Sequence, residues 1–127
     1  RTNFILFRRG SGMSLDIDLV EKWEGSVFRK NITHNLGKMA DNIPVGNNTT
    51  LYDIMWDLED KFPNRTKAKQ IAIPLTKALI YINTHEKELS EYNPENGWGS
   101  YYSLKDFVEQ YLIACCTYPN ARIRICR

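Results

Sequence analysis

The sequence predicts an α+β protein, a two-layer sandwich in which two main helices cover a small, mainly antiparallel sheet whose first and last strands are paired. Residues 14–19 and 122–125 alternate apolar and charged side chains, which is the period-two pattern of half-buried strands. Between them, two long segments repeat apolar residues at steps of three and four, as amphipathic helices do. This order of elements favours helices packed on one face of a sheet.

The two alternating segments carry opposite charges on their polar faces. The first has aspartates there and the last has arginines. Opposite charges directly across a sheet stabilise it by about 0.2–1 kcal/mol per pair. We therefore expect the two strands to be neighbours, with Asp16 and Asp18 near Arg122 and Arg124. A third strand is expected over residues 27–32.

Capping residues and prolines predict where the helices begin and break. Thr50 is expected to cap a short helix from Leu51 to Leu58. The longest helix is expected over about 64–92, with a kink or a break at Pro74, because proline lacks an N–H and clashes with the preceding turn. Ser103 is expected to open the other main helix, with Asp106 as its capping partner.

Length and charge suit one globular domain. The chain has 127 residues, of which 43% are hydrophobic and 25% charged. Its net charge is +2, but the three arginines in residues 1–12 supply +3, so the remainder sums to −1 and nucleic-acid binding is not expected. A Gly-Ser-Gly run before Met13 predicts that 1–12 is an engineered extension or linker and 13–127 the single domain. Alternatively, residues 3–7 form a genuine strand.

The cysteines predict free thiols. There are three, Cys115, Cys116 and Cys126, which is an odd number and a poor disulfide framework, so a reducing, cytoplasmic compartment is expected. Without any C-x-x-C spacing, no metal or cofactor site is expected. No apolar run approaches the roughly 18–20 residues that cross a bilayer, so no membrane association is expected either.

Two segments concentrate polar and aromatic residues. The first holds Asn31, Thr33, His34 and Asn35; an imidazole there could contact a ligand or move a proton, or the polar side chains could simply satisfy backbone groups where a strand turns into a helix. The second, over 93–101, places glycines on both sides of a tryptophan and so frees the backbone for a sharp turn. Its candidate contacts are Asn96, Trp98 and Tyr101. Alternatively, the tryptophan fills the seam between the two main helices.

These same segments carry a family resemblance. The runs N-I-T-H-N-L-G-K-M (31–39) and N-P-E-N-G-W-G-S-Y (93–101), with the closing Ala-Cys pair, Pro119 and the I-R-I-x-R strand, resemble a family of small uncharacterised proteins of bacteriophages, prophages and bacteria. The resemblance covers roughly residues 15–127. It implies an accessory role, such as antagonism of host defence by binding a host protein or sequestering a signalling nucleotide.

Three hypotheses follow for the function. The first is a non-enzymatic binding protein whose two polar turns meet in one site for a small polar or nucleotide-like ligand, because amides and an imidazole read hydrogen bonds and an indole stacks. The second is a protein-interaction module with exposed aromatic residues: Tyr52, Trp56, Tyr101 or Tyr102. The third is an enzyme that pairs His34 with a carboxylate brought close by folding: Asp41, Asp53 or Glu95.

Overall fold

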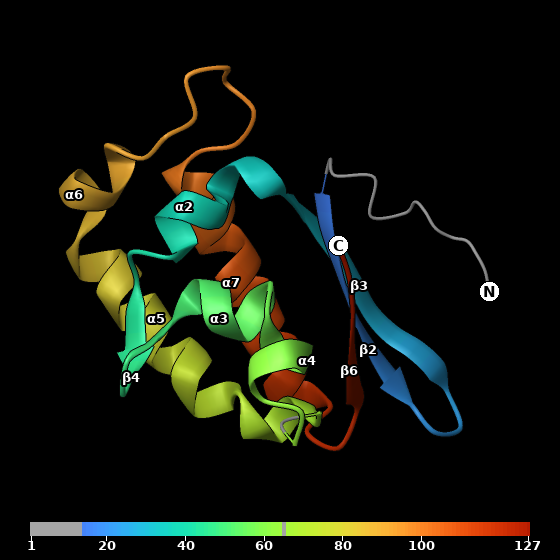
Figure 1. The fold of residues 1–127 in the computed structure, drawn as a ribbon. Coiled ribbons are helices and arrows are strands. Elements are labelled where there is room, and N and C mark those ends of the chain that lie inside the picture. Colours follow the sequence, from blue (N-terminus) through green and yellow to red (C-terminus); the bar gives the residue numbers. More distant parts are fainter. Residues whose placement is uncertain (1–13, 65) are drawn as a thin grey trace.

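A three-stranded antiparallel sheet forms one layer of the protein (Figure 1). The computed structural model describes residues 14–64 and 66–127; the expectations for residues 1–12 fall outside these. The strands β2 (Ser14–Glu21), β3 (Gly25–Thr33) and β6 (Arg122–Cys126) lie in the order β3-β2-β6. The predicted pairing of first and last strands is therefore confirmed, and so is the third strand.

Side chains alternate across the central strand as the sequence predicts. Leu15, Ile17 and Leu19 are completely buried against the helices. On the opposite face, the Asp18 carboxylate accepts hydrogen bonds from Arg29 on β3 and Arg124 on β6. The expected charge pairing is confirmed for Asp18 and Arg124. The rest of it is wrong: in the register of β2 and β6, Asp16 stands opposite Cys126, and Val20 stands opposite Arg122.

Two main helices, α5 (Ala72–Thr84) and α7 (Tyr101–Thr117), lie on one face of the sheet and pack against each other (Figure 1). Pro74 neither kinks nor breaks α5. It is the third residue of that helix, in the first turn, where an N–H has no acceptor within the helix. The break comes instead at His85, whose backbone leaves the helical region (φ −132°, ψ 37°). The longest helix is α7, not the 64–92 segment.

The start of α7 lies a few residues before the predicted one. Ser100 is the N-cap, and the Ser103 hydroxyl oxygen accepts a hydrogen bond from the Ser100 backbone N–H. Ser103 therefore serves as the third residue of the helix, and Asp106 pairs with Lys30 instead of capping. The sequence offered two serines three residues apart, and the earlier one has the extended backbone that a cap requires.

Short elements connect these layers. Thr50 caps as predicted, in a reciprocal arrangement with Asp53, but the helix it opens is shorter than expected and a second short helix follows it. The short elements are η1 (His34–Leu36), α2 (Gly37–Ala40), β4 (Pro44–Gly46), β5 (Thr49–Thr50), α3 (Leu51–Met55), α4 (Leu58–Lys61), η2 (Ala68–Gln70) and α6 (Glu86–Ser90).

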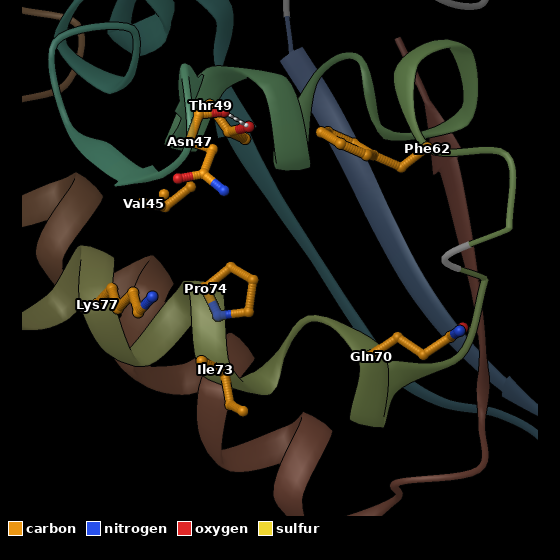
Figure 2. Close-up of a pocket in the computed structure, with 9 residues that line it drawn as sticks. Val45, Asn47, Thr49, Phe62, Gln70, Ile73, Pro74 and Lys77 are labelled. Atoms are coloured by element: carbon orange, nitrogen blue, oxygen red, sulfur yellow. Dashed lines mark hydrogen bonds between the residues drawn. The ribbon is translucent and has the colours of Figure 1, made fainter.

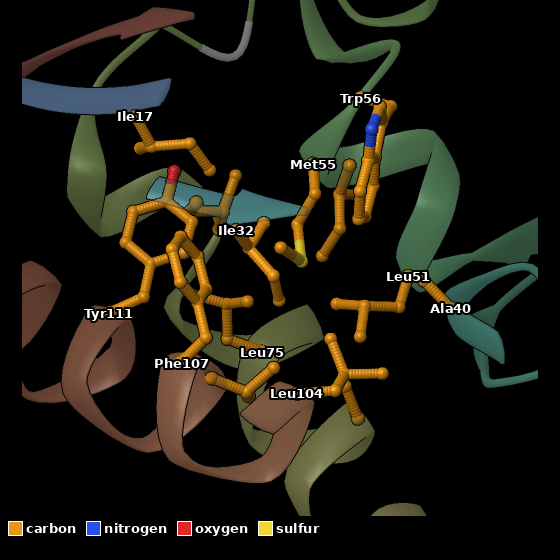
Figure 3. Packing of buried hydrophobic residues seen from close by; sticks show 14 of the residues in the cluster. Ile17, Ile32, Ala40, Leu51, Met55, Trp56, Leu75, Leu104, Phe107 and Tyr111 are labelled. Carbon is orange, nitrogen blue, oxygen red and sulfur yellow. The ribbon is translucent and has the colours of Figure 1, made fainter. Parts of the chain in front are cut away.

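The core lies between the sheet and the helices. Figure 3 shows side chains of the sheet, α3 and both main helices meeting there, among them Ile17, Met55, Leu75 and Phe107. Burial of this apolar surface supplies the main stabilisation, at roughly 25 cal/mol per Å² removed from water. Leu36 is completely buried in this core, and its burial determines the position of η1.

Candidate functional site

The first polar segment lies where β3 ends and η1 begins. The Thr33 hydroxyl oxygen accepts a hydrogen bond from the Asn35 backbone N–H at 3.2 Å, so Thr33 is the N-cap of η1. Part of this segment therefore satisfies backbone groups, as one of the sequence interpretations expected. The Leu36 side chain is buried in the core and fixes the position of η1. The His34 ring, in the same short helix, therefore lies at the edge of the core.

His34 is oriented by a tryptophan. The Trp56 indole N–H donates to His34 Nδ1 at 2.9 Å. Since an indole nitrogen can only donate, Nδ1 carries no proton, and the proton of the neutral ring sits on Nε2. Burial lowers the pKa of His34, the positive charge of Arg127 lowers it further, and Asp16 opposes both effects. At neutral pH the ring is a neutral donor at Nε2.

A hollow of about 340 Å³ lies beside this ring. Its lining residues are His34, Tyr52, Trp56 and Arg127. The Tyr52 and Trp56 rings are stacked, with centroids 5.2 Å apart and planes 4° from parallel. They are one helical turn apart in sequence, so α3 and its C-terminal end present both rings together.

Arg127 brings a positive charge to this hollow. Its Nη1 donates to the Trp56 carbonyl oxygen at 3.3 Å and to Asp57 Oδ1 at 2.7 Å. Both bonds use the same nitrogen, so among the described residues Nε and Nη2 have no hydrogen-bonding partner. These two nitrogens form the edge of a guanidinium that binds a carboxylate or a phosphate with two parallel hydrogen bonds.

The second polar segment is a turn that leads into α7. The Asn96 side chain accepts a hydrogen bond from the Trp98 backbone N–H at 2.9 Å. The Trp98 side chain is 62% exposed, so it does not fill the seam between the helices. Tyr101 is buried instead, and its hydroxyl donates to the Ile82 carbonyl oxygen. Tyr101 is therefore part of the core, where no ligand could reach it.

The two polar segments meet at a glycine. Gly99 has a φ of +98°, and a β-carbon built on it would lie 2.8 Å from the Thr33 methyl group and 3.1 Å from Leu36. A second hollow of about 340 Å³ lies at this junction. Asn31, Thr33, Gly99 and Ser103 are among the residues that line it.

The structure thus brings Asn31 and Thr33 beside the second turn but assigns His34 to the other hollow. Trp98 lines neither of these two hollows. Sequence reasoning treated Tyr52 and Trp56 only as surface aromatics, although Trp56 is 3% exposed, and it did not select Arg127 at all. The four-residue spacing of the two rings was the available signal; nothing in the sequence places Arg127 beside them.

Two of the three carboxylates considered for a His34-based enzyme have other roles. Asp53 accepts hydrogen bonds from Thr50 and Lys61, and Asp41 accepts one from Thr50. No carboxylate is hydrogen-bonded to His34 in the described part of the chain. Burial raises the pKa of the Cys115 thiol to about 12, so it stays protonated and inert.

Comparison with known proteins adds no relative. Neither family models, nor curated protein sequences, nor solved structures give a match to this chain. Within residues 14–64 and 66–127, no group of three or more metal-ligating side chains converges. None of the helices there has the length and apolar character that crossing a bilayer requires.

Proposed function

We propose that the protein binds a small, planar, anionic ligand in the hollow formed by His34, Tyr52, Trp56 and Arg127, which we call the His34 hollow. The observation that carries the proposal is the free Nε–Nη2 edge of Arg127 beside a stacked pair of aromatic rings. A phosphate or carboxylate would take both hydrogen bonds of this edge. The planar part of the ligand would lie against Tyr52, which is half-buried.

The polar groups of the His34 hollow are hydrogen-bond donors, so they favour ligands that carry hydrogen-bond acceptors. Arg127 is a permanent donor, and His34 Nε2 is a donor in the neutral ring. A volume of about 340 Å³ is at the small end of ligand pockets, which run from roughly 300 to 1,000 Å³. A nucleoside monophosphate fits this description, with its base on the tyrosine ring and its phosphate on the guanidinium.

Binding without catalysis is the better interpretation of His34. Its Nδ1 accepts from Trp56, which fixes the ring, and no carboxylate orients it as a base. The proposed role is that of a phage-type accessory protein that holds a nucleotide-like ligand. Cys115 and Cys116 are free thiols, which agrees with the cytoplasmic location included in this proposal.

A protein-interaction role is the second candidate. Trp98 and Tyr102 are more than 60% exposed on the turn before α7 and in its first turn. Tryptophan and tyrosine are enriched among the residues that dominate interface energetics. Trp56 and Tyr101, however, are buried and cannot belong to such a surface. Any interface would therefore centre on Trp98 and would leave the His34 hollow unused.

Tryptophan fluorescence separates these two proposals. The chain has three tryptophans, and Trp23 and Trp98 are exposed, so replacing both with phenylalanine leaves Trp56 as the reporter without disturbing the core. Adenosine monophosphate is expected to change the Trp56 emission in a saturable manner, and unphosphorylated adenosine is expected to bind more weakly. Arg127→Gln should weaken the binding of adenosine monophosphate about tenfold, since charge-assisted hydrogen bonds are the strong ones.

The matched control is Arg122→Gln, at the start of β6, the strand that ends just before Arg127. Arg122 is exposed and does not line the His34 hollow, so this variant should bind like the parent protein. Equal weakening by both arginine variants would show only a general charge effect. Benzoate, a smaller planar anion, is the second probe. The absence of any saturable response to either adenosine monophosphate or benzoate would overturn the proposal.

A further inference from the structure

A hollow larger than the two above lies between the hairpin β4–β5 and helix α5 (Figure 2). Its volume is about 500 Å³. Val45, Asn47 and Thr49 approach it from the hairpin, and Pro74 and Lys77 approach it from α5. Strand β4 packs against α5, so the two walls are held by core contacts. We call it the hairpin hollow.

One side of the hairpin hollow is apolar. Val45 is buried and belongs to the core, and the Phe62 ring, which packs against the core, extends toward the hollow in Figure 2. The Pro74 ring forms the facing surface on α5. These three side chains could cover a short apolar group and remove it from water, which is favourable at roughly 25 cal/mol per Å².

The other side of the hairpin hollow offers hydrogen-bond donors. Lys77 lines it, and among the described residues no carboxylate pairs with its ammonium group. Two lysines elsewhere do pair with carboxylates: Lys61 binds Asp53, and Lys30 binds Asp106. The Asn47 amide is directed across the gap toward α5. None of the residues that line the hollow is acidic.

From this lining we propose a second ligand site, in the hairpin hollow, for a small carboxylate that carries a short apolar tail. The carboxylate pairs with the Lys77 ammonium and accepts a hydrogen bond from the Asn47 amide. The tail lies on Phe62 and Pro74. An ammonium ligand is disfavoured, because Lys77 would repel it and no acidic group could attract it. The site shares no residue with the His34 hollow, so each proposal stands or fails separately.

Amide chemical shifts of the whole protein test the second site. Hexanoate at low ionic strength is expected to shift the backbone amides of Gly46 and Asn47 in a saturable manner, whereas acetate, without the tail, binds more weakly. Lys77→Gln should weaken hexanoate binding about fivefold, the upper range for an exposed ion pair. Lys87→Gln, an exposed lysine on α6 away from the hollow, is the control and should leave the affinity unchanged.

Two ligands of matched size identify the chemistry. Hexylamine has the same number of carbons and the opposite charge, so it should not produce these shifts. Equal affinity of hexylamine and hexanoate, or an unchanged affinity in Lys77→Gln, would overturn the proposal. So would the absence of shifts at Gly46 and Asn47 under saturating hexanoate. Shifts confined to the Trp56 indole would place hexanoate in the His34 hollow and would also overturn it.

Discussion

Gly99 is the residue at which the two polar turns come together. Its φ of +98° lies in the region that favours glycine, and the space where a β-carbon would sit is already occupied by Thr33 and Leu36. Gly97, two residues earlier, also has a positive φ (+76°) but faces open space. Both glycines have a backbone conformation that favours glycine, but only Gly99 also lies too close to its neighbours for a β-carbon. Comparing the two positions therefore separates these two effects.

Replacing each of these glycines with alanine is expected to have different costs. Gly97→Ala should lower the free energy of unfolding by about 1 kcal/mol through backbone strain alone. Gly99→Ala should lower it by about 2–4 kcal/mol, because the strain is joined by a clash with Thr33. Denaturant unfolding of both variants measures the difference. Equal destabilisation would mean that the approach of Gly99 to Thr33 contributes nothing to stability.

The sheet is stabilised at its centre by an ionic cluster. Burial alone would raise the pKa of Asp18, but hydrogen bonds from Arg29 and Arg124 outweigh it and hold the pKa below its ordinary value of 3.8. These arginines come from the two outer strands, so the carboxylate joins all three strands. A carboxyl group whose pKa is lowered by folding stabilises the protein above its unfolded pKa, and this stabilisation is lost on acidification.

Asp18→Asn is expected to lower the free energy of unfolding at neutral pH by about 1–3 kcal/mol, the cost of removing a charged partner from a hydrogen-bonded cluster. The difference from the parent protein should persist down to about pH 4 and shrink as the pH falls further, through the lowered pKa of the folded state. Denaturant unfolding as a function of pH measures it. Asp106→Asn, in the exposed pair with Lys30, should change stability by less than about 1 kcal/mol. A pH-independent effect of Asp18→Asn would contradict this account.

At the scale of elements, strands were more predictable than helix boundaries. The alternation over 14–19 and 122–125 led directly to paired neighbours, because it determines which face of each strand is buried. It does not determine the register, since a shift of two residues buries the same face, and Asp16 stands opposite Cys126. The helical segment was misjudged because a proline is tolerated in a first turn and the sequence does not say where that turn is. The actual break at His85 has no proline or glycine to mark it.

For the molecule as a whole, the sequence located the polar turns but not their partners. It predicted that the segments around His34 and Trp98 would approach each other, and Gly99 does contact Thr33. It could not predict that His34 would face Trp56 and Arg127, because these residues are 22 and 93 positions away along the chain and meet only through the fold. Side-chain direction at a turn is set by packing, which local sequence does not encode.

The measurement that tests the proposed site most directly is the pKa of His34, followed by NMR in the free protein and with adenosine monophosphate. In the free protein burial and Arg127 hold this pKa below 6.5. A phosphate bound by Arg127 would cancel the repulsive charge and favour the imidazolium, so saturating ligand is predicted to raise the pKa of His34. A pKa that stays the same while the ligand is bound would show that the anion lies elsewhere and would contradict the account.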